Sequence, residues 1–174
     1  EAVAEPRNCP YVGLDYYQEK FGAWFFGREA DGNKIITNMQ AARLTLLHAE
    51  SGVGKSSLLR AGVAWRLRQL VPPESPFRGV VDIPVVFSSW KDDPTAELIG
   101  AIGTAIEPFL SGRPRPSLPG QLDAAIEVAA DAANASLLVI LDQFEEYFVY
   151  CAREPTPERF ADELARCINR ADLP

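Results

Sequence analysis

Cysteine and histidine are scarce in this chain of 174 residues, which contains three cysteines and one histidine. Cys9, Cys151 and Cys167 are an odd number at wide and irregular spacing, and no two of them form a C-x-x-C pair. A disulfide framework and a zinc site both need regular sets of such residues. The sequence therefore argues against both and predicts reduced thiols.

Basic residues and long apolar runs are also in short supply. The 17 lysines and arginines are outnumbered by 24 aspartates and glutamates, which gives a formal charge of −7. A broad surface for nucleic acid or anionic lipid needs clustered positive charge, so we predict neither nucleic acid nor membrane as a partner. No apolar run reaches the ~18 residues of a membrane span, and the N-terminus lacks the basic-then-apolar order of a secretion signal. We expect a cytoplasmic protein.

The apolar residues, 47% of the chain, suffice for one core and alternate between strand-like and helical patterns. Strands are predicted at 43–49, at 85–88 after Pro84, and at 137–141. Helices are predicted at 31–42, 54–70, 93–110 and 121–133, and a last one begins at Thr156-Pro157. Long crossovers between strands indicate an α/β fold with a parallel sheet, whose ligands bind at the carboxyl ends of the strands.

A phosphate-binding loop is predicted at residues 49–56, which match G-x-x-x-x-G-K-[ST] at every position except Ala49. Small residues let successive backbone N–H groups point at a phosphate, and the following helix presents its free amides to the same anion. Lys55 can then reach the β- and γ-phosphate oxygens, and the Ser56 hydroxyl can coordinate Mg²⁺. The predicted nucleotide-binding residues of this loop are Glu50, Ser51, Gly52, Val53, Gly54, Lys55, Ser56 and Ser57.

The second half of such a site is predicted at Asp142, which directly follows the apolar run LLVIL. A carboxylate there can orient the metal together with Ser56, as in a Walker B motif, although an aspartate after a strand can also cap the next helix. Hydrolysis further needs a group that takes a proton from the attacking water. Gln143 cannot do so, whereas Glu145 and Glu146 can, and solvated acidic side chains are the alternative for this pair.

The nucleotide base is predicted from motifs that are missing. GTPases carry D-x-x-G after this strand and N-K-x-D for the guanine base. Position 145 is Glu, and the single Asn-Lys pair, Asn33-Lys34, precedes the loop and is followed by two isoleucines. The sequence therefore disfavours guanine and leaves ATP and ADP, with Mg²⁺, as the predicted ligands.

Four segments in combination resemble the novel STAND branch of the signal-transducing P-loop ATPases, which are related to NACHT and AAA+ ATPases. They are YVGLDYYQEKFGAWFFGREAD (11–31), SGVGKSSLLRAGV (51–63), FSSWKDDPTAEL (87–98) and LLVILDQFEEYF (137–148). The resemblance implies that Arg28 lies near the nucleotide and that Glu145 is the first choice for activating water. Asp31 stands where the family pattern usually has Glu.

The same resemblance implies an N-terminal segment with a Gly-Arg-Glu motif at 1–30 and a P-loop NTPase core with a parallel sheet and flanking helices at 31–174. Family members continue into a sensor strand and a lid, and three strands are few for such a sheet. We therefore expect the chain to be truncated before the sensor strand and the lid. The aromatic residues near the N-terminus are predicted to pack onto the sheet, and Arg60, Arg66 and Arg68 to form a solvated helix face.

Three functions follow from these observations. The first is an ATP-dependent switch that binds ATP and Mg²⁺, hydrolyses ATP slowly, and regulates self-association or effector domains of a larger protein, a role that family members in bacterial defence illustrate. The second is a non-hydrolysing nucleotide-binding scaffold or interaction domain. The third, a small-molecule kinase, is weaker because the sequence holds no acceptor-binding or lid motif.

Overall fold

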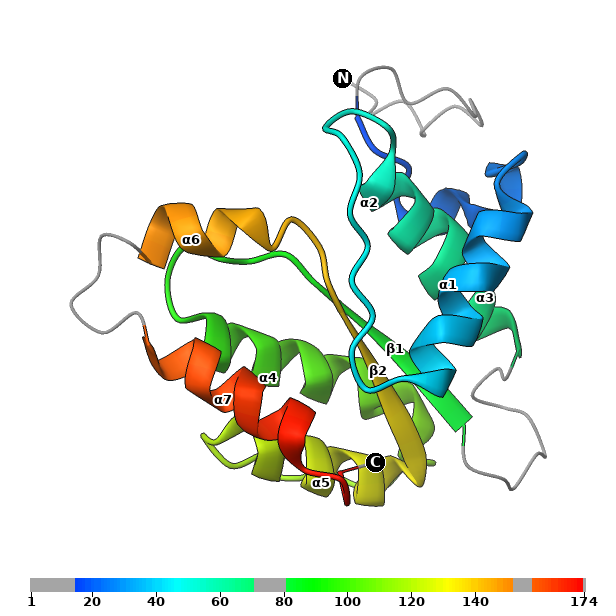
Figure 1. Ribbon diagram of the computed structural model, residues 1–174. Coiled ribbons are helices and arrows are strands. Elements are labelled where there is room, and N and C mark those ends of the chain that lie inside the picture. Colours follow the sequence, from blue (N-terminus) through cyan, green and yellow to red (C-terminus); the bar gives the residue numbers. More distant parts are fainter. Residues whose placement is uncertain (1–14, 71–80, 152–157, 174) are drawn as a thin grey trace, which may run out of the picture.

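Two parallel strands form the sheet at the centre of the structure, a computed structural model that describes residues 15–70, 81–151 and 158–173 (Figure 1). Strand β1 (Val81–Phe87) pairs with β2 (Ala135–Leu141), in register from Val81 opposite Ala135 to Phe87 opposite Leu141. The predicted α/β class with parallel strands is therefore confirmed at this level. The complete P-loop NTPase core stays a prediction.

Three helices cover one face of the sheet: α4 (Pro94–Ile106), α5 (Leu122–Ala133) and α7 (Glu158–Asn169) (Figure 1). The start of α4 follows from its sequence, because the Asp93 carboxylate accepts hydrogen bonds from the backbone N–H groups of Thr95 and Ala96 at 3.0 and 3.1 Å. A 3₁₀ turn (Glu107–Phe109) follows this helix. The core beneath these helices includes Val81, Ile83, Val85, Phe87, Trp90, Leu98, Ile102, Ile106, Leu122, Ile126 and Phe160.

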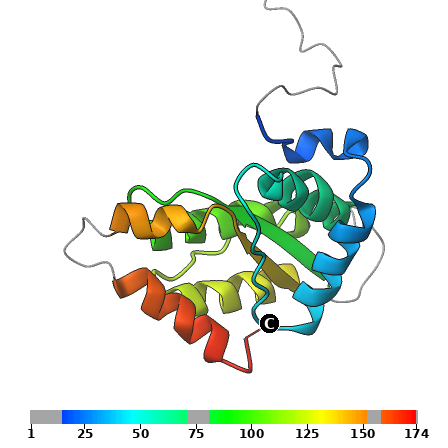
Figure 2. The ribbon, with the colours of Figure 1, turned by 45° about the horizontal axis from the view of Figure 1, so that its top comes forward.

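Helix α1 (Glu29–Ala41) and one long helical stretch cover the opposite face, so that the sheet lies between two helical layers (Figure 2). The long stretch consists of α2 (Lys55–Ser57), a π-helical segment η2 (Leu58–Ala64) and α3 (Trp65–Leu70). The core on this side is made of Ile35, Ile36, Leu58, Val63, Ala64, Leu67 and Ile140. A 3₁₀ helix η1 (Glu19–Trp24) precedes α1, and helix α6 (Glu145–Cys151) follows β2.

The helix predictions agree with the structure. The predicted helices at 31–42, 54–70, 93–110 and 121–133 correspond to α1, to the stretch from α2 to α3, to α4 with its 3₁₀ turn, and to α5. Asn134 ends α5 in the left-handed conformation at φ 51°, where its N–H reaches the carbonyl of Ala130. The predicted start of the last helix at Thr156-Pro157 lies outside the described residues.

The predicted strand at 43–49 is wrong. Residues 44–50 adopt no regular structure, and no backbone–backbone hydrogen bond joins them to another residue in the described part of the chain. Leu47 packs against the core that includes Ile140 of β2, yet Leu44 and Leu46 are 63% and 85% exposed. The apolar pattern therefore brings this segment to the sheet (Figure 1). It does not become a strand there, because a strand needs a neighbour whose backbone groups pair with its own.

The predicted break at Pro84 is also wrong, since β1 runs through this residue. Pro84 lies opposite Leu138 in the parallel register, and its carbonyl accepts a hydrogen bond from Nη2 of Arg68 at 3.0 Å. The N and C=O of one residue point to the same side of a strand, so the missing N–H of Pro84 faces Arg68 and away from β2. The proline therefore removes no bond from the ladder.

Cys167 is a buried free thiol on α7, as predicted for a reduced cysteine. Burial, together with the nearby carboxylates of Asp123 and Glu163, raises the pKa of this thiol to about 11. Cys9 lies outside the described residues. None of the helices in the part of the chain that the structure describes is long and apolar enough to span a membrane.

Candidate functional site

The predicted phosphate-binding loop connects the 44–50 segment to α2, and two glycines shape it. Gly52 and Gly54 both adopt the left-handed conformation, at φ 83° and 81°, which favours glycine. Gly54 stands directly before the first residue of α2, so the chain turns there from loop to helix. Glu50, Ser51 and Val53 are exposed. The glycine spacing of the sequence motif is therefore used to turn the backbone.

The side chain of Lys55 is folded back onto the loop. Its Nζ donates hydrogen bonds to the carbonyl oxygens of Ala49 and Glu50, both at 2.9 Å. These contacts join the start of the helix to the start of the loop and place the ammonium group inside the turn. A cation held by two neutral carbonyls is free to exchange them for an anion, because it has no carboxylate partner in the described part of the chain.

Ser56 and Asp142 are in contact although 86 positions separate them. The Ser56 hydroxyl donates a hydrogen bond to Oδ1 of Asp142 at 2.9 Å. Asp142 is only 3% exposed, and its backbone is fixed on both sides, since its N–H donates to the carbonyl of Phe87 and its carbonyl accepts from Nε1 of Trp90. The carboxylate therefore stands at the carboxyl end of the sheet, next to the first turn of α2.

Arg60 completes this contact, and the prediction that it forms a solvated helix face is wrong. Its Nε donates to Oδ2 of Asp142 at 3.1 Å, and its Nη2 donates to Oγ of Ser88 at 2.8 Å. The ring of Tyr16 lies 5.0 Å from its guanidinium carbon, a cation–π distance. Arg60 follows Ser56 by four residues, about one helical turn. This spacing is the signal in the sequence that could have placed both on the same side.

The Gly-Arg-Glu motif lies against the loop. Gly27 is left-handed at φ 85°, and Nη1 of Arg28 donates to the carbonyl of Val53 at 2.9 Å while its Nε pairs with Asp31. The backbone N–H groups of Glu29 and Gly27 hold the pKa of the Glu29 carboxyl below its ordinary value. Each residue of the motif therefore fixes either the start of α1 or the tip of the loop, and Arg28 contacts the predicted phosphate-binding loop at Val53.

Ser57 differs from the rest of the predicted nucleotide-binding set. It is buried, and its Oγ accepts a hydrogen bond from the backbone N–H of Tyr17 at 3.0 Å. Tyr17 also packs against Phe21 and Phe25 in the aromatic cluster that precedes α1. The Ser57 side chain is thus engaged by the N-terminal part of the chain.

Glu145 and Glu146 occupy the first turn of α6, which begins just past Asp142 (Figure 1). Gln143 makes the connecting turn in the left-handed conformation at φ 56°, and its carbonyl accepts from the N–H of Glu146 at 2.9 Å. Glu145 is exposed and Glu146 is half-buried. Neither carboxylate hydrogen-bonds or pairs with another described residue, and both stand in the first turn of α6 after the strand end.

The residues that could hold a metal ion are few. In the described ranges, no group of three or more His, Cys, Asp or Glu side chains is arranged so that it could hold a metal ion. Mg²⁺ usually binds to one or two protein oxygens and takes its other ligands from water and substrate phosphates. The pair of the Ser56 hydroxyl and the Asp142 carboxylate fits this donor set, because both are hard oxygen ligands and they already lie 2.9 Å apart.

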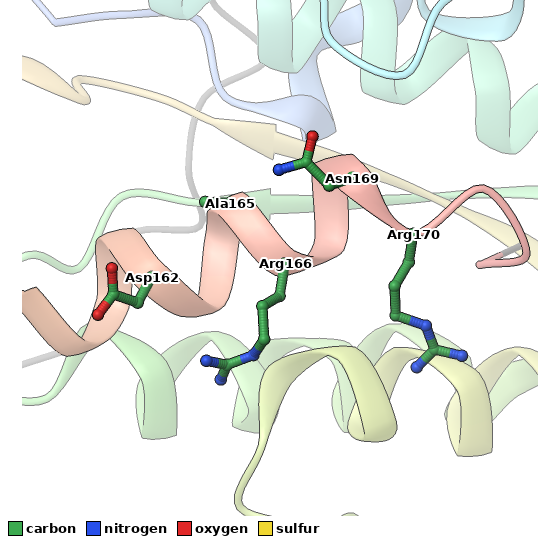
Figure 3. Close-up of a pocket in the computed structure, with 5 residues that line it drawn as sticks. All are labelled: Asp162, Ala165, Arg166, Asn169 and Arg170. Carbon is green, nitrogen blue, oxygen red and sulfur yellow. The ribbon is translucent and has the colours of Figure 1, made fainter.

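A second polar region lies on α7, away from the loop. Asp162, Ala165, Arg166, Asn169 and Arg170 line a hollow of about 500 Å³ (Figure 3). Its arginines already have carboxylate partners. Arg170 pairs with Asp172, Glu127 and Asp123, and these carboxylates raise its pKa. Arg166 contacts Glu163 at 3.3 Å. Arg170 therefore joins α7 to α5 through Asp123 and Glu127.

Sequence reasoning missed Glu163, which stands on the apolar stripe of α7 and is 4% exposed. Its Oε2 accepts a hydrogen bond from the backbone N–H of Leu122, the first residue of α5, at 2.6 Å. A glutamate between Phe160 and Cys167 on a buried stripe is the signal that could have found it. The side chain caps a neighbouring helix.

One comparison with known proteins gives a match over most of the chain. A family model described as Novel STAND NTPase 1 matches residues 10–173. No curated protein and no solved structure gives a match.

Proposed function

The chain belongs to the Novel STAND NTPase 1 family, and from that premise we propose that it is the ATP- and Mg²⁺-binding domain of a nucleotide-dependent switch with slow ATP hydrolysis. The observation that carries the proposal is the contact between the Ser56 hydroxyl and the buried Asp142 carboxylate. It unites the two parts of a triphosphate site that the sequence keeps apart. The family makes the domain an NTPase of the signalling kind, and the finer assignments are ours.

Phosphate binding is assigned to the loop and to Lys55. The left-handed glycines Gly52 and Gly54 curl the backbone, and the helix behind them offers free N–H groups and the positive end of its dipole. The proposed binding residues are Glu50, Ser51, Gly52, Val53, Gly54, Lys55, Ser56 and Ser57, the last through its backbone N–H. Lys55 would exchange the two carbonyls it now contacts for β- and γ-phosphate oxygens.

Mg²⁺ is assigned to Ser56 and Asp142, with the nucleotide phosphates as its further ligands. When bound, the ion neutralises charge that develops on the phosphates during transfer. The chain's own contribution is to present one hydroxyl and one carboxylate oxygen from two different elements. Asp142 is suited to this because its backbone is bonded to Phe87 and Trp90 and cannot shift freely.

Hydrolysis is assigned to Glu145, with Glu146 as the second candidate. In the reaction, a water oxygen bonds to the γ-phosphorus, the bond from that phosphorus to the β–γ bridging oxygen breaks, and ADP leaves. A carboxylate must accept the proton of the water. The exposed Glu145 follows Asp142 by three residues and can turn toward the loop without unpairing from a partner. The proposed rate is slow because neither glutamate is held in place by a described contact.

We assign the switch to contacts between the loop and the N-terminal part of the chain. We propose that residues 1–30 form one segment and that residues 31–174 form the core. Arg28 bonds the loop at Val53, and Tyr17 bonds Ser57. A nucleotide that rearranges the loop would alter both contacts and bias self-association or the position of other domains of a larger protein. We propose a cytoplasmic location. Because the chain is acidic, we propose neither nucleic acid nor membrane as a partner.

Two measurements test the proposal. Binding of ATP, measured by calorimetry, should weaken about 100-fold in Lys55→Ala, because the variant loses the cation for two phosphates. Binding that is unchanged in this variant contradicts the assignment of the loop. Phosphate release by the full-length protein should then be lost in Glu145→Gln while ATP binding persists.

The alternative function is a nucleotide-binding scaffold without hydrolysis. It is favoured by the absence of a contact that fixes Glu145 or Glu146 among the described residues. Phosphate release from the unaltered protein that does not exceed the rate without protein would support the scaffold and refute the catalytic assignment.

A further inference from the structure

The side chain of Arg60 is held more firmly than a surface arginine on a helix. It is 19% exposed, and three elements surround its guanidinium group: the end of β2 through Asp142, the end of β1 through Ser88, and the N-terminal part of the chain through Tyr16. Two of its nitrogens donate to different acceptors at 3.1 and 2.8 Å. Nothing in the proposed binding of phosphate or metal uses this arrangement.

The two oxygens of Asp142 are divided between two partners. Oδ1 accepts from Ser56 and Oδ2 accepts from Arg60. A carboxylate on a short side chain can rotate about its last bond, and that rotation exchanges the two oxygens or turns both away from the loop. Arg60 opposes the rotation, because its Nη2 is anchored on Ser88 and its Nε then has one direction in which to donate.

We propose that Arg60 is a positioning residue for the metal: it holds Oδ2 of Asp142 so that Oδ1 faces Ser56 and is available to Mg²⁺. The inference rests on the proposed function, because it concerns the same site. Arg60 touches neither nucleotide nor metal in this account. It acts through Asp142, because it occupies one oxygen of that buried carboxylate and leaves the other to Ser56 and the metal.

Two other roles for Arg60 give different results. An arginine that contacts the phosphates directly would contribute to nucleotide binding with and without metal. An arginine that blocks the carboxylate and must leave when the metal binds would weaken Mg²⁺ binding, and its removal would strengthen it. The positioning role is the one in which removal weakens the response to Mg²⁺ and leaves metal-free binding of nucleotide intact.

The test measures ATP binding to the chain by calorimetry, in excess EDTA and over a series of Mg²⁺ concentrations. In Arg60→Gln the Mg²⁺ concentration that gives half of the maximal change in ATP affinity should rise about tenfold, which corresponds to the loss of one hydrogen bond to a buried charge. ATP affinity in EDTA should change less than about twofold. Arg60→Lys, which keeps a cation and one donor, should recover part of the Mg²⁺ response.

Matched variants keep the outcome interpretable. Arg66→Gln removes an arginine from the same helical stretch whose Nη1 contacts the side chain of Asn33, and it should leave both measurements unchanged. Asp142→Asn should remove most of the Mg²⁺ response. Thermal unfolding of Arg60→Gln without nucleotide checks that the chain is folded, and Arg60→Lys takes its place if it is not.

An unchanged Mg²⁺ response in Arg60→Gln, with the response lost in Asp142→Asn, overturns the inference and leaves the proposed function standing. Weaker ATP binding in EDTA overturns it in favour of direct phosphate contact, and a stronger Mg²⁺ response overturns it in favour of a blocking role. ATP binding that is absent in the unaltered chain refutes the proposed function and this inference together.

Discussion

The two faces of the sheet differ in how they are packed. Under α4, α5 and α7 the core is continuous, and Ile83, Ile102 and Ile106 are completely buried. On the other face, the 44–50 segment leaves Leu46 exposed. Oγ1 of Thr45 is buried there without a hydrogen-bond partner in the described part of the chain. Close packing stabilises the first face, whereas individual polar contacts place the loop on the second.

We call β1, β2, α4, α5 and α7 the packed region, and residues 44–60 the loop region. The candidate site lies at the boundary between the two. Asp142 belongs to the packed region, because its backbone groups bond to Phe87 and Trp90. Ser56 and Arg60 belong to the loop region and reach across to the carboxylate. The proposed switch needs one part that responds to the ligand and one that does not, and we assign these to the loop and to the Asp142 carboxylate. Substitutions in the two regions should therefore have separable effects.

The strongest contrast should come from apolar side chains. Ile102→Ala, which empties a fully buried position on α4, should lower the free energy of unfolding by about 2–5 kcal/mol. Leu46→Ser in the loop region should change it by less than about 0.5 kcal/mol, because that side chain is already in water. Urea denaturation followed by circular dichroism measures both. Equal effects in the two variants would abolish the distinction between the regions.

A smaller effect is expected at the buried polar contact of the packed region. Glu163→Ala removes the cap of α5 and leaves the N–H of Leu122 without its acceptor, which should cost about 1–3 kcal/mol. Glu107→Ala, at an exposed glutamate, serves as the control. Chemical denaturation compares the two. If Glu163→Ala lowers the free energy of unfolding no more than Glu107→Ala does, the Glu163 carboxylate does not stabilise the packed region.

Glycine-to-alanine substitutions should have opposite signs in the two regions. Gly54→Ala puts a side chain on a left-handed residue of the loop and should lower the free energy of unfolding by about 1 kcal/mol. Gly100→Ala lies in α4, where an added Cβ meets nothing within 4 Å, and should raise it by about 0.5–1 kcal/mol. Changes of the same sign, measured by thermal unfolding, would show that local conformation does not separate the regions.

The last contrast concerns Cys167 and pH. Its pKa is raised to about 11 in the folded chain, so above pH ~9 the unfolded chain loses this proton first and the folded state loses relative stability. The free energy of unfolding should therefore fall more steeply between pH 9 and about 11 in the unaltered chain than in Cys167→Ala. Parallel pH dependences would mean that the thiol is not held in an apolar site.

The sequence predicted the elements whose signals are local. Periodicity placed the helices, Asp93-Pro94 placed the start of α4, and the glycine spacing placed the turn before Lys55. The sequence-based prediction failed for segments whose structure depends on which other segment they contact. The 43–49 segment has the composition of a strand without a paired neighbour, and Pro84 sits in a strand because its missing N–H faces outward. Neither the missing neighbour of 43–49 nor the direction of the Pro84 nitrogen can be predicted from the residue types alone.

The candidate site was predictable in its residues and less so in its contacts. A loop motif and an aspartate after an apolar run identified Lys55, Ser56 and Asp142, because their chemistry dictates their spacing. The contacts of Arg60 were missed, since a run of arginines on a helix is usually solvated. Its four-residue spacing from Ser56 acquires meaning only when Asp142 is known to stand opposite that face.

The central claim is that the two regions meet in one metal-dependent nucleotide site at Ser56 and Asp142. A double-mutant cycle tests it most directly, with ATP affinity measured in Mg²⁺ and in EDTA for Ser56→Ala, Asp142→Asn and the double variant. The account predicts a coupling of about 1 kcal/mol or more in Mg²⁺ and a much smaller one in EDTA, because the two side chains share one ion. Additive losses in Mg²⁺ would contradict it.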